Sequence, residues 1–251
     1  MTQPLLIFAL AVGVGGLSSL LGIGGGILLV PIFTLILKLP IHQAIALSLC
    51  CVMATSVTAA TKYLSKNLID LKAVLLLETT TIVGSYLAGK MAGLVPEGII
   101  SIIFSVLMIA SAVVMLLGRH EAKPKDDAVG TGYPLALGVS VFAGGLVGLL
   151  GIGGGIVKVP IMQLTLGKSV KEAVAASSMM IGISAAVAVI PYMSRGDVPL
   201  DWVPFATLGT ALGAFAGSNL FHKIESLYIK LLFTAVLLYT AISMIIEGLR
   251  R

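Results

Sequence analysis

The sequence predicts an all-α integral membrane protein made of two tandem repeats of four hydrophobic segments, and three observations carry this prediction. Of the 251 residues, 58% are hydrophobic and only 11% are charged, whereas soluble domains carry about 25% charged residues. Apolar runs of the length that crosses a bilayer, about 20 residues, recur along the chain. The second half of the sequence also repeats the first at an offset of 129 positions. A water-soluble globular protein is therefore excluded.

Eight apolar segments are bounded by charged residues, proline or glycine. They cover residues 5–37, 41–64, 73–94, 99–118, 133–166, 173–194, 199–221 and 226–248. Six of them have the length of one membrane helix. The first and fifth would each form about 50 Å of straight helix, against a hydrocarbon core of about 30 Å. We expect these two segments to tilt strongly, to break or to turn back.

The two halves are copies of each other. Residues 15–32 align with residues 144–161, and only four of these 18 positions differ: Ser18/Val147, Ser19/Gly148, Leu28/Val157 and Leu29/Lys158. The register continues without a gap to the end of the chain, which is typical of a tandem duplication. We predict a first transmembrane repeat at 1–118, a hydrophilic linker at 119–130 and a second transmembrane repeat at 131–251.

The orientation of the second repeat depends on the long segments. If each crosses the membrane once, the repeats are parallel; if each turns back as a broken hairpin, the repeats are inverted. Excluding Lys158, the single-crossing arrangement places nine Lys and Arg on the side of the linker and six on the other, and the hairpin arrangement gives ten against five. The positive-inside rule therefore places the linker in the cytoplasm in both arrangements and favours the inverted one weakly.

The motif GIGGG occurs once in each long segment, at 22–26 and 151–155. Each glycine inside a helix costs about 1 kcal/mol relative to alanine, so we expect the helix to break there. In lipid, a broken helix is tolerated only where it is packed in protein or lines a cavity. A restarting helix presents free N–H groups that suit an anion, and paired broken helices indicate a transporter site. The alternative is that the glycines only allow close helix packing. The candidate substrate-binding glycines are Gly22, Gly24, Gly25, Gly26, Gly151, Gly153, Gly154 and Gly155.

Lys158 gives the second copy a charge that the first lacks, because its counterpart is Leu29. A lysine at the centre of a bilayer costs about 2.5–3.5 kcal/mol on insertion scales, so an anionic substrate or a carboxylate should offset it. Glu78 is the candidate carboxylate and a candidate proton carrier. The alternatives are that Lys158 extends to an interface and that Glu78 lies near the headgroups.

Hydroxyl side chains recur at spacings that place them on one helix face. They can donate hydrogen bonds to an oxyanion or form contacts between helices. The candidates for substrate contact are Ser48, Thr55, Ser177, Ser178 and Ser184. Gly213 and Gly217 form a GxxxG pair, mirrored by Gly84 and Ala88, which we interpret as helix packing.

No motif indicates catalysis or a cofactor. Cys50 and Cys51 are adjacent and lack the spacing of a metal site, and the chain has no catalytic triad, zinc-protease motif or phosphate loop. The Lys and Arg residues lie mostly between apolar runs, where they act as topology signals. We expect no enzyme activity, no metal, no cofactor and no nucleic-acid partner.

The doubled pattern GLxxLLGIGGGxxxVPI, at 16–32 and 145–161, resembles the sulfite exporter TauE/SafE family, also grouped as toluene sulfonate uptake permeases. The resemblance spans essentially the whole chain. It implies a duplicated membrane unit in a bacterial-type inner membrane and the movement of small sulfur-containing anions such as sulfite or organosulfonates. It does not account for Lys158.

The residues and the resemblance together predict a secondary transporter of a small sulfur oxyanion that works by alternating access between the repeats. An anion-selective channel is the alternative, and a non-transporting scaffold is a third hypothesis. The expected partners are a small anion and the lipid bilayer, with a homodimer left open.

Overall fold

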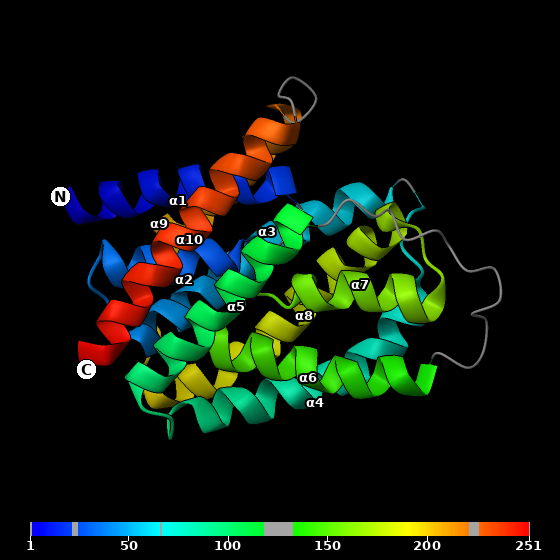
Figure 1. Cartoon of the computed structure of the whole chain (residues 1–251), viewed down its shortest axis with the longest axis horizontal. Coiled ribbons are helices and arrows are strands. Elements are labelled where there is room, and N and C mark those ends of the chain that lie inside the picture. Colours follow the sequence, from blue (N-terminus) through cyan, green and yellow to red (C-terminus); the bar gives the residue numbers. More distant parts are fainter. Residues whose placement is uncertain (1, 22–24, 66, 118–132, 221–225, 251) are drawn as a thin grey trace.

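The computed structural model describes residues 2–21, 25–65, 67–117, 133–220 and 226–250, and within these ranges every regular element is a helix (Figure 1). In chain order the helices are α1 (Thr2–Leu21), α2 (Gly26–Leu35), α3 (Ile41–Leu64), α4 (Leu71–Ala92), α5 (Glu97–Leu117), α6 (Tyr133–Leu150), α7 (Gly155–Leu166), α8 (Val170–Arg195), α9 (Val203–Leu220) and α10 (Ser226–Arg250). The predicted all-α class is confirmed.

Both long apolar segments are broken at the glycine motifs. The first consists of α1 and the ten-residue α2, and the second of α6 and the twelve-residue α7. At 1.5 Å per residue, α2 and α7 are about 15 and 18 Å long, so neither can cross a hydrocarbon core of about 30 Å by itself. They are half-helices that begin inside the protein.

At each break the chain turns back on the helix that it has just left. A Cβ built on Gly154 would lie 2.8 Å from the side chain of Val147, and one on Gly25 would lie 3.3 Å from the side chain of Ser18. In a straight helix, residues seven apart are separated by about 10 Å along the axis. Gly25 and Gly154 both have positive φ, 78° and 69°, a conformation open to glycine. The segments are therefore hairpins and not single long helices.

Helices of one half pack against helices of the other. α1 lies along α9 and α4 lies along α6, while α3 packs on α8 and α5 on α10. In the repeat, α1 corresponds to α6 and α4 corresponds to α9. The contact between α1 and α9 is therefore equivalent to the contact between α6 and α4. In Figure 1, α1 begins and α10 ends at the left of the view, whereas α6 begins at the right.

Glycines set the distance between the paired helices. A Cβ on Gly84 would overlap the carbonyl of Val141 in α6, and a Cβ on Gly213 would overlap the carbonyl of Val12 in α1. These two contacts occupy equivalent positions in the two halves. The packing role predicted for Gly84 and Gly213 is confirmed, because the backbones could not approach so closely with a larger residue.

Among the described residues, three helical stretches are long and apolar enough to cross a membrane: Ile41–Thr61, Leu71–Ala92 and Lys171–Arg195. Shorter apolar stretches occur in α1, α2, α5, α6, α9 and α10. Polar side chains cap the starts of α4 and α8: the Asp70 carboxylate accepts from the amides of Lys72 and Ala73, and the Ser169 hydroxyl accepts from the amide of Glu172. Such caps suit helix ends that meet water.

The largest buried cluster surrounds α2 and α3. It includes Ile27, Leu28 and Phe33 of α2, together with Ile45 and Leu49 of α3, and it extends to residues of α5, α8 and α10. The half-helix α2 is buried along most of its length. The first glycine break therefore leads directly into the centre of the molecule.

Candidate functional site

The two glycine breaks meet in the interior of the protein. A Cβ on Gly26, the first residue of α2, would overlap the carbonyl oxygen of Gly151 and would lie 2.9 Å from the Cα of Ile152. The Ser48 hydroxyl of α3 donates to that same Gly151 carbonyl at 3.1 Å. Gly26 is thus required for contact between the breaks, and Ser48 satisfies a carbonyl that the break frees. This is the arrangement that irregular backbone needs at membrane depth.

Two buried helix N-termini lie at this junction. The N-caps are Gly25 for α2 and Gly154 for α7, both buried, and no side chain in the described structure caps either of them. The first amides of a helix have no partner within the helix, and the aligned peptide dipoles give that end about half a positive charge. A buried N-terminus without a capping side chain is suited to bind an anion.

Lys158 lies on the first turns of α7 and folds back toward the break. Its Cε would be 3.7 Å from a Cβ on Gly154, and its Nζ lies 3.3 Å from Oε2 of Glu78 in α4 and 3.2 Å from Oγ of Ser184 in α8. Lys158 and Glu78 are each only 2% exposed. Both side chains are therefore enclosed by protein, and each lies within hydrogen-bonding distance of the other.

One carboxylate oxygen of this ion pair is left without a partner. Oε1 of Glu78 is buried and accepts no hydrogen bond in the described structure. A buried carboxylate that is only half satisfied is costly, because each oxygen has lost its water. The free oxygen is a position that can take up a proton.

The other predicted hydroxyls do not converge on Lys158 through hydrogen bonds. Thr55 donates to the carbonyl of Val52, and Ser178 donates to that of Val174, each within its own helix. Ser177 is buried and its hydroxyl has no described partner. Ser184 is thus the one member of the set that contacts the lysine directly, and Ser177 is a free donor in the interior.

Ser18 is a polar residue at the first break that the sequence reasoning did not select. Its hydroxyl is buried and has no described hydrogen-bond partner, and it lies 3.3 Å from a Cβ built on Gly25. The equivalent position at the second break is Val147. The signal was present in the sequence, because Ser18/Val147 is one of the four differences between the two copies of the motif.

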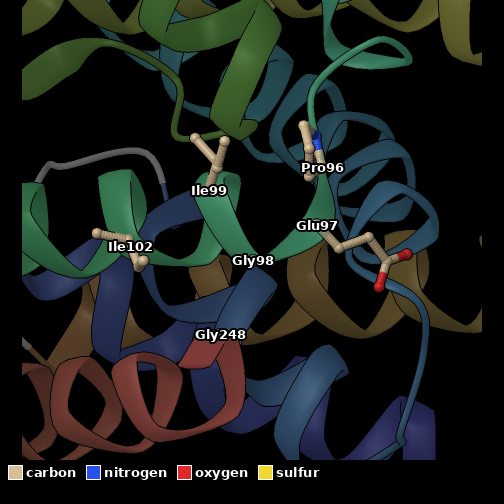
Figure 2. Close-up of a pocket in the computed structure, with 6 residues that line it drawn as sticks. All are labelled: Pro96, Glu97, Gly98, Ile99, Ile102 and Gly248. Carbon is tan, nitrogen blue, oxygen red and sulfur yellow. The ribbon is translucent and has the colours of Figure 1, made fainter. Parts of the chain in front are cut away.

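Of the predicted glycines, Gly25, Gly26, Gly151, Gly153, Gly154 and Gly155 are buried at the junction, and Gly22 and Gly24 lie outside the described residues. An open pocket at the start of α5 and the end of α10 shares no residue with the junction (Figure 2). Its lining residues are Pro96, Glu97, Gly98, Ile99, Ile102 and Gly248. Its one charged side chain is acidic, which does not suit an anion.

A family model for sulfite exporters of the TauE/SafE type matches residues 7–244 of the chain. The chain belongs to the TauE/SafE sulfite exporter family. The match includes both glycine breaks and every predicted site residue. It shows a membrane transporter family and not an enzyme family.

Curated relatives of this TauE/SafE protein are named as membrane transporters. The chain is 27% identical to "Probable membrane transporter protein YunE" of Bacillus subtilis, with 97% of this chain and 98% of the relative covered. It is 24% identical to "Probable membrane transporter protein YdhB" of the same organism, over 95% and 98%. It is 34% identical to a "Probable membrane transporter protein" of Methanocaldococcus jannaschii, over 76% and 72%. No solved structure gives a significant match. The protein is a multi-pass membrane protein.

Proposed function

We propose that the protein is a secondary transporter of a small sulfur-containing oxyanion, such as sulfite or an organosulfonate, which binds where the two glycine breaks meet. The observation that carries this proposal is the contact of Gly26 with Gly151, because it brings the uncapped N-termini of two half-helices to one buried place. Transport proceeds by alternating exposure of that junction to the two sides of the membrane.

The chemistry of the junction suits an oxyanion. Free helix amides and the hydroxyl of Ser18, beside Gly25, are hydrogen-bond donors. The Lys158 ammonium, beside the α7 N-terminus, supplies a full positive charge. The tetrahedral or pyramidal oxygens of a sulfonate or sulfite can accept from several such donors at once. The description of the TauE/SafE family supports the sulfur anion as the substrate class.

Ligand-induced stabilisation tests the site. The purified protein is heated in detergent with sulfite, sulfate, thiosulfate, sulfoacetate, taurine or a carboxylate control, because a ligand that binds the folded state raises the melting temperature. We expect stabilisation by a sulfur anion, its loss in Lys158→Ala, and its retention in Lys90→Ala, which removes an exposed lysine of α4. A stabilisation that is unchanged in Lys158→Ala would remove the lysine from the site.

Counterflow in proteoliposomes tests the mechanism. A transporter that alternates exposes its site to one side at a time, so unlabelled anion inside the vesicles accelerates the uptake of labelled anion. We expect saturable exchange of this kind. Anion flux without acceleration by internal anion would contradict alternating access and indicate a channel.

A further inference from the structure

Lys158 and Glu78 are the only charged side chains that are buried in the described part of the chain. The lysine comes from the second half and the glutamate from the first, so the ion pair joins α7 to α4 across the two halves. Together the two groups are electrically neutral. The substrate proposed above brings a negative charge into this environment.

The equivalent positions on α2 and α9 carry no such pair. At the 129-residue offset the counterparts of Lys158, Glu78 and Ser184 are Leu29, Thr207 and Thr55. Leu29 is buried in the apolar core, and the hydroxyls of Thr207 and Thr55 donate to carbonyls of their own helices. Within the described residues, this ion pair is therefore the one buried place that holds charged side chains.

An anion that contacts Lys158 competes with the carboxylate of Glu78 for the same ammonium group. With both anions present the site has a net charge of −1, which is unfavourable in a low-dielectric interior. A proton taken from water onto Oε1 of Glu78 restores neutrality without forming or breaking any bond of the substrate. The protonated carboxyl group then has an O–H donor where Oε1 has no partner in the present structure.

We infer that Glu78 is the coupling site for protons, so that one proton binds with each anion and the two cross the membrane together. This inference rests on the proposed function and names the coupled ion. The charged or polar groups that face Glu78 are Lys158 of α7 and Ser184 of α8, and α6, which also packs on α4, has no charged residue. For a monovalent anion, transport is electroneutral.

Proton uptake by the wild-type protein gives the direct test. Methanesulfonate and thiosulfate are suitable probes, because neither changes its protonation near neutral pH. In a weakly buffered detergent solution, we expect each anion bound to remove close to one proton from the medium. Saturable anion binding with no change in the proton concentration would overturn the inference.

A pH gradient across proteoliposomes tests the coupling and its residue. Electroneutral cotransport of one proton with methanesulfonate accumulates the anion about tenfold per pH unit at equilibrium. We expect Glu78→Gln to reduce this accumulation ratio to about one while it still exchanges labelled for unlabelled anion. Glu97→Gln, which changes a carboxylate outside the junction, should accumulate the anion like the wild type. Accumulation that persists in Glu78→Gln would overturn the assignment.

The two proposals fail in different ways. If the wild type neither binds nor exchanges a sulfur anion, the proposed function is wrong, and so is the inference that Glu78 couples protons to the anion. If the wild type exchanges the anion but a pH gradient does not drive its accumulation, the transporter stands and only the coupling is wrong. If Glu78→Gln does not fold, the proton-uptake measurement on the wild type still decides.

Discussion

The buried ammonium group of Lys158 has two polar partners inside the protein. Glu78 and Ser184 both lie within 3.3 Å of Nζ, and both belong to helices that pack against each other. The apolar run around Lys158 predicted that something must offset its charge, but the sequence alone could not decide between a carboxylate, a ligand and an interface. The buried ion pair supplies that offset in the structure.

A double-mutant cycle should show strong coupling between these two charges. Removing one partner of a buried ion pair leaves the other charge unpaired and typically costs about 3–5 kcal/mol, whereas removing both is much less harmful. We expect Lys158→Met and Glu78→Gln each to lower the melting temperature in detergent, and the double variant to recover most of the loss. Additive losses in the double variant would show that the two residues do not interact.

Ser18 should affect binding without affecting stability. Its hydroxyl is buried and unpartnered beside Gly25, so Ser18→Ala removes an unsatisfied group and should leave the melting temperature unchanged or slightly higher. If the hydroxyl donates to the anion, affinity should fall about three- to tenfold, the value of one hydrogen bond. Ser105→Ala removes a buried hydroxyl that donates within α5 and should leave affinity unchanged. Equal affinities for the wild type and Ser18→Ala would exclude this contact.

At the scale of the helices, the contact between the two breaks depends on the absence of a side chain at Gly26. A methyl group there would overlap the Gly151 carbonyl, and overpacking of this kind costs about 1–3 kcal/mol. Gly26→Ala should therefore lower both the melting temperature and the transport rate. Gly138→Ala is the matched control, because a Cβ at Gly138 meets nothing within 4 Å and alanine is the better helix former. Equal effects of the two substitutions would show that the junction tolerates bulk.

The ion pair between Asp70 and Lys168 joins the start of α4 to the turn between α7 and α8, at 2.7 Å. The Lys168 ammonium lowers the pKa of Asp70 below its ordinary value of 3.8, with further help from the amides of α4. A carboxylate with a lowered pKa stabilises the fold above its unfolded pKa, and this stabilisation is lost as the pH falls through the folded pKa.

Asp70→Asn should retain the helix cap and lose the ion pair. At neutral pH we expect a deficit of about 1 kcal/mol or less, because both side chains are partly exposed. The difference in melting temperature from the wild type should shrink below about pH 4. A difference that stays constant from neutral to acidic pH would show that the carboxylate charge does not contribute.

The sequence was most informative about single elements and least informative about their partners. The cost of four glycines in five positions predicted both breaks, and the structure begins α2 at Gly26 and α7 at Gly155. The direction of the chain after each break could not be predicted, because a tilted single helix and a hairpin have the same composition. The structure shows the hairpin through contacts between residues seven positions apart in the sequence, such as Gly154 and Val147.

The sequence could not predict which distant helices pack against each other, and the reason is physical. Apolar side chains line both the core and the lipid-facing surface of a membrane protein, so hydrophobic periodicity does not show which helices touch. Gly84 and Gly213 indicated that close contacts exist, but not that α4 pairs with α6 or α1 with α9. Glu78 was a candidate partner for Lys158 as a carboxylate in an apolar segment, but the sequence could not show that the two residues, 80 positions apart, are in contact.

At the scale of the whole molecule, the first helix of each half packs mainly on the other half. α1 lies along α9, and α6 lies along α4, so neither half contains the principal packing partner of its own first helix. The two breaks likewise touch each other across the halves, at Gly26 and Gly151. Movement of one half relative to the other therefore changes the junction directly, which is the geometric requirement for alternating access.

The hairpins also determine which ends of the chain share a side of the membrane. α1 begins and α10 ends at the left of the view, and α6 begins at the right (Figure 1). Excluding Lys158, the hairpin arrangement puts ten Lys and Arg on the side of the linker and five on the other, which predicts a cytoplasmic linker. A reporter active only outside the cytoplasm should be active when fused after Arg251 and inactive when inserted in the linker at 119–130. A reporter active only in the cytoplasm should give the reverse pattern. If both positions report the same side, each half crosses the membrane an even number of times and the hairpin topology is wrong.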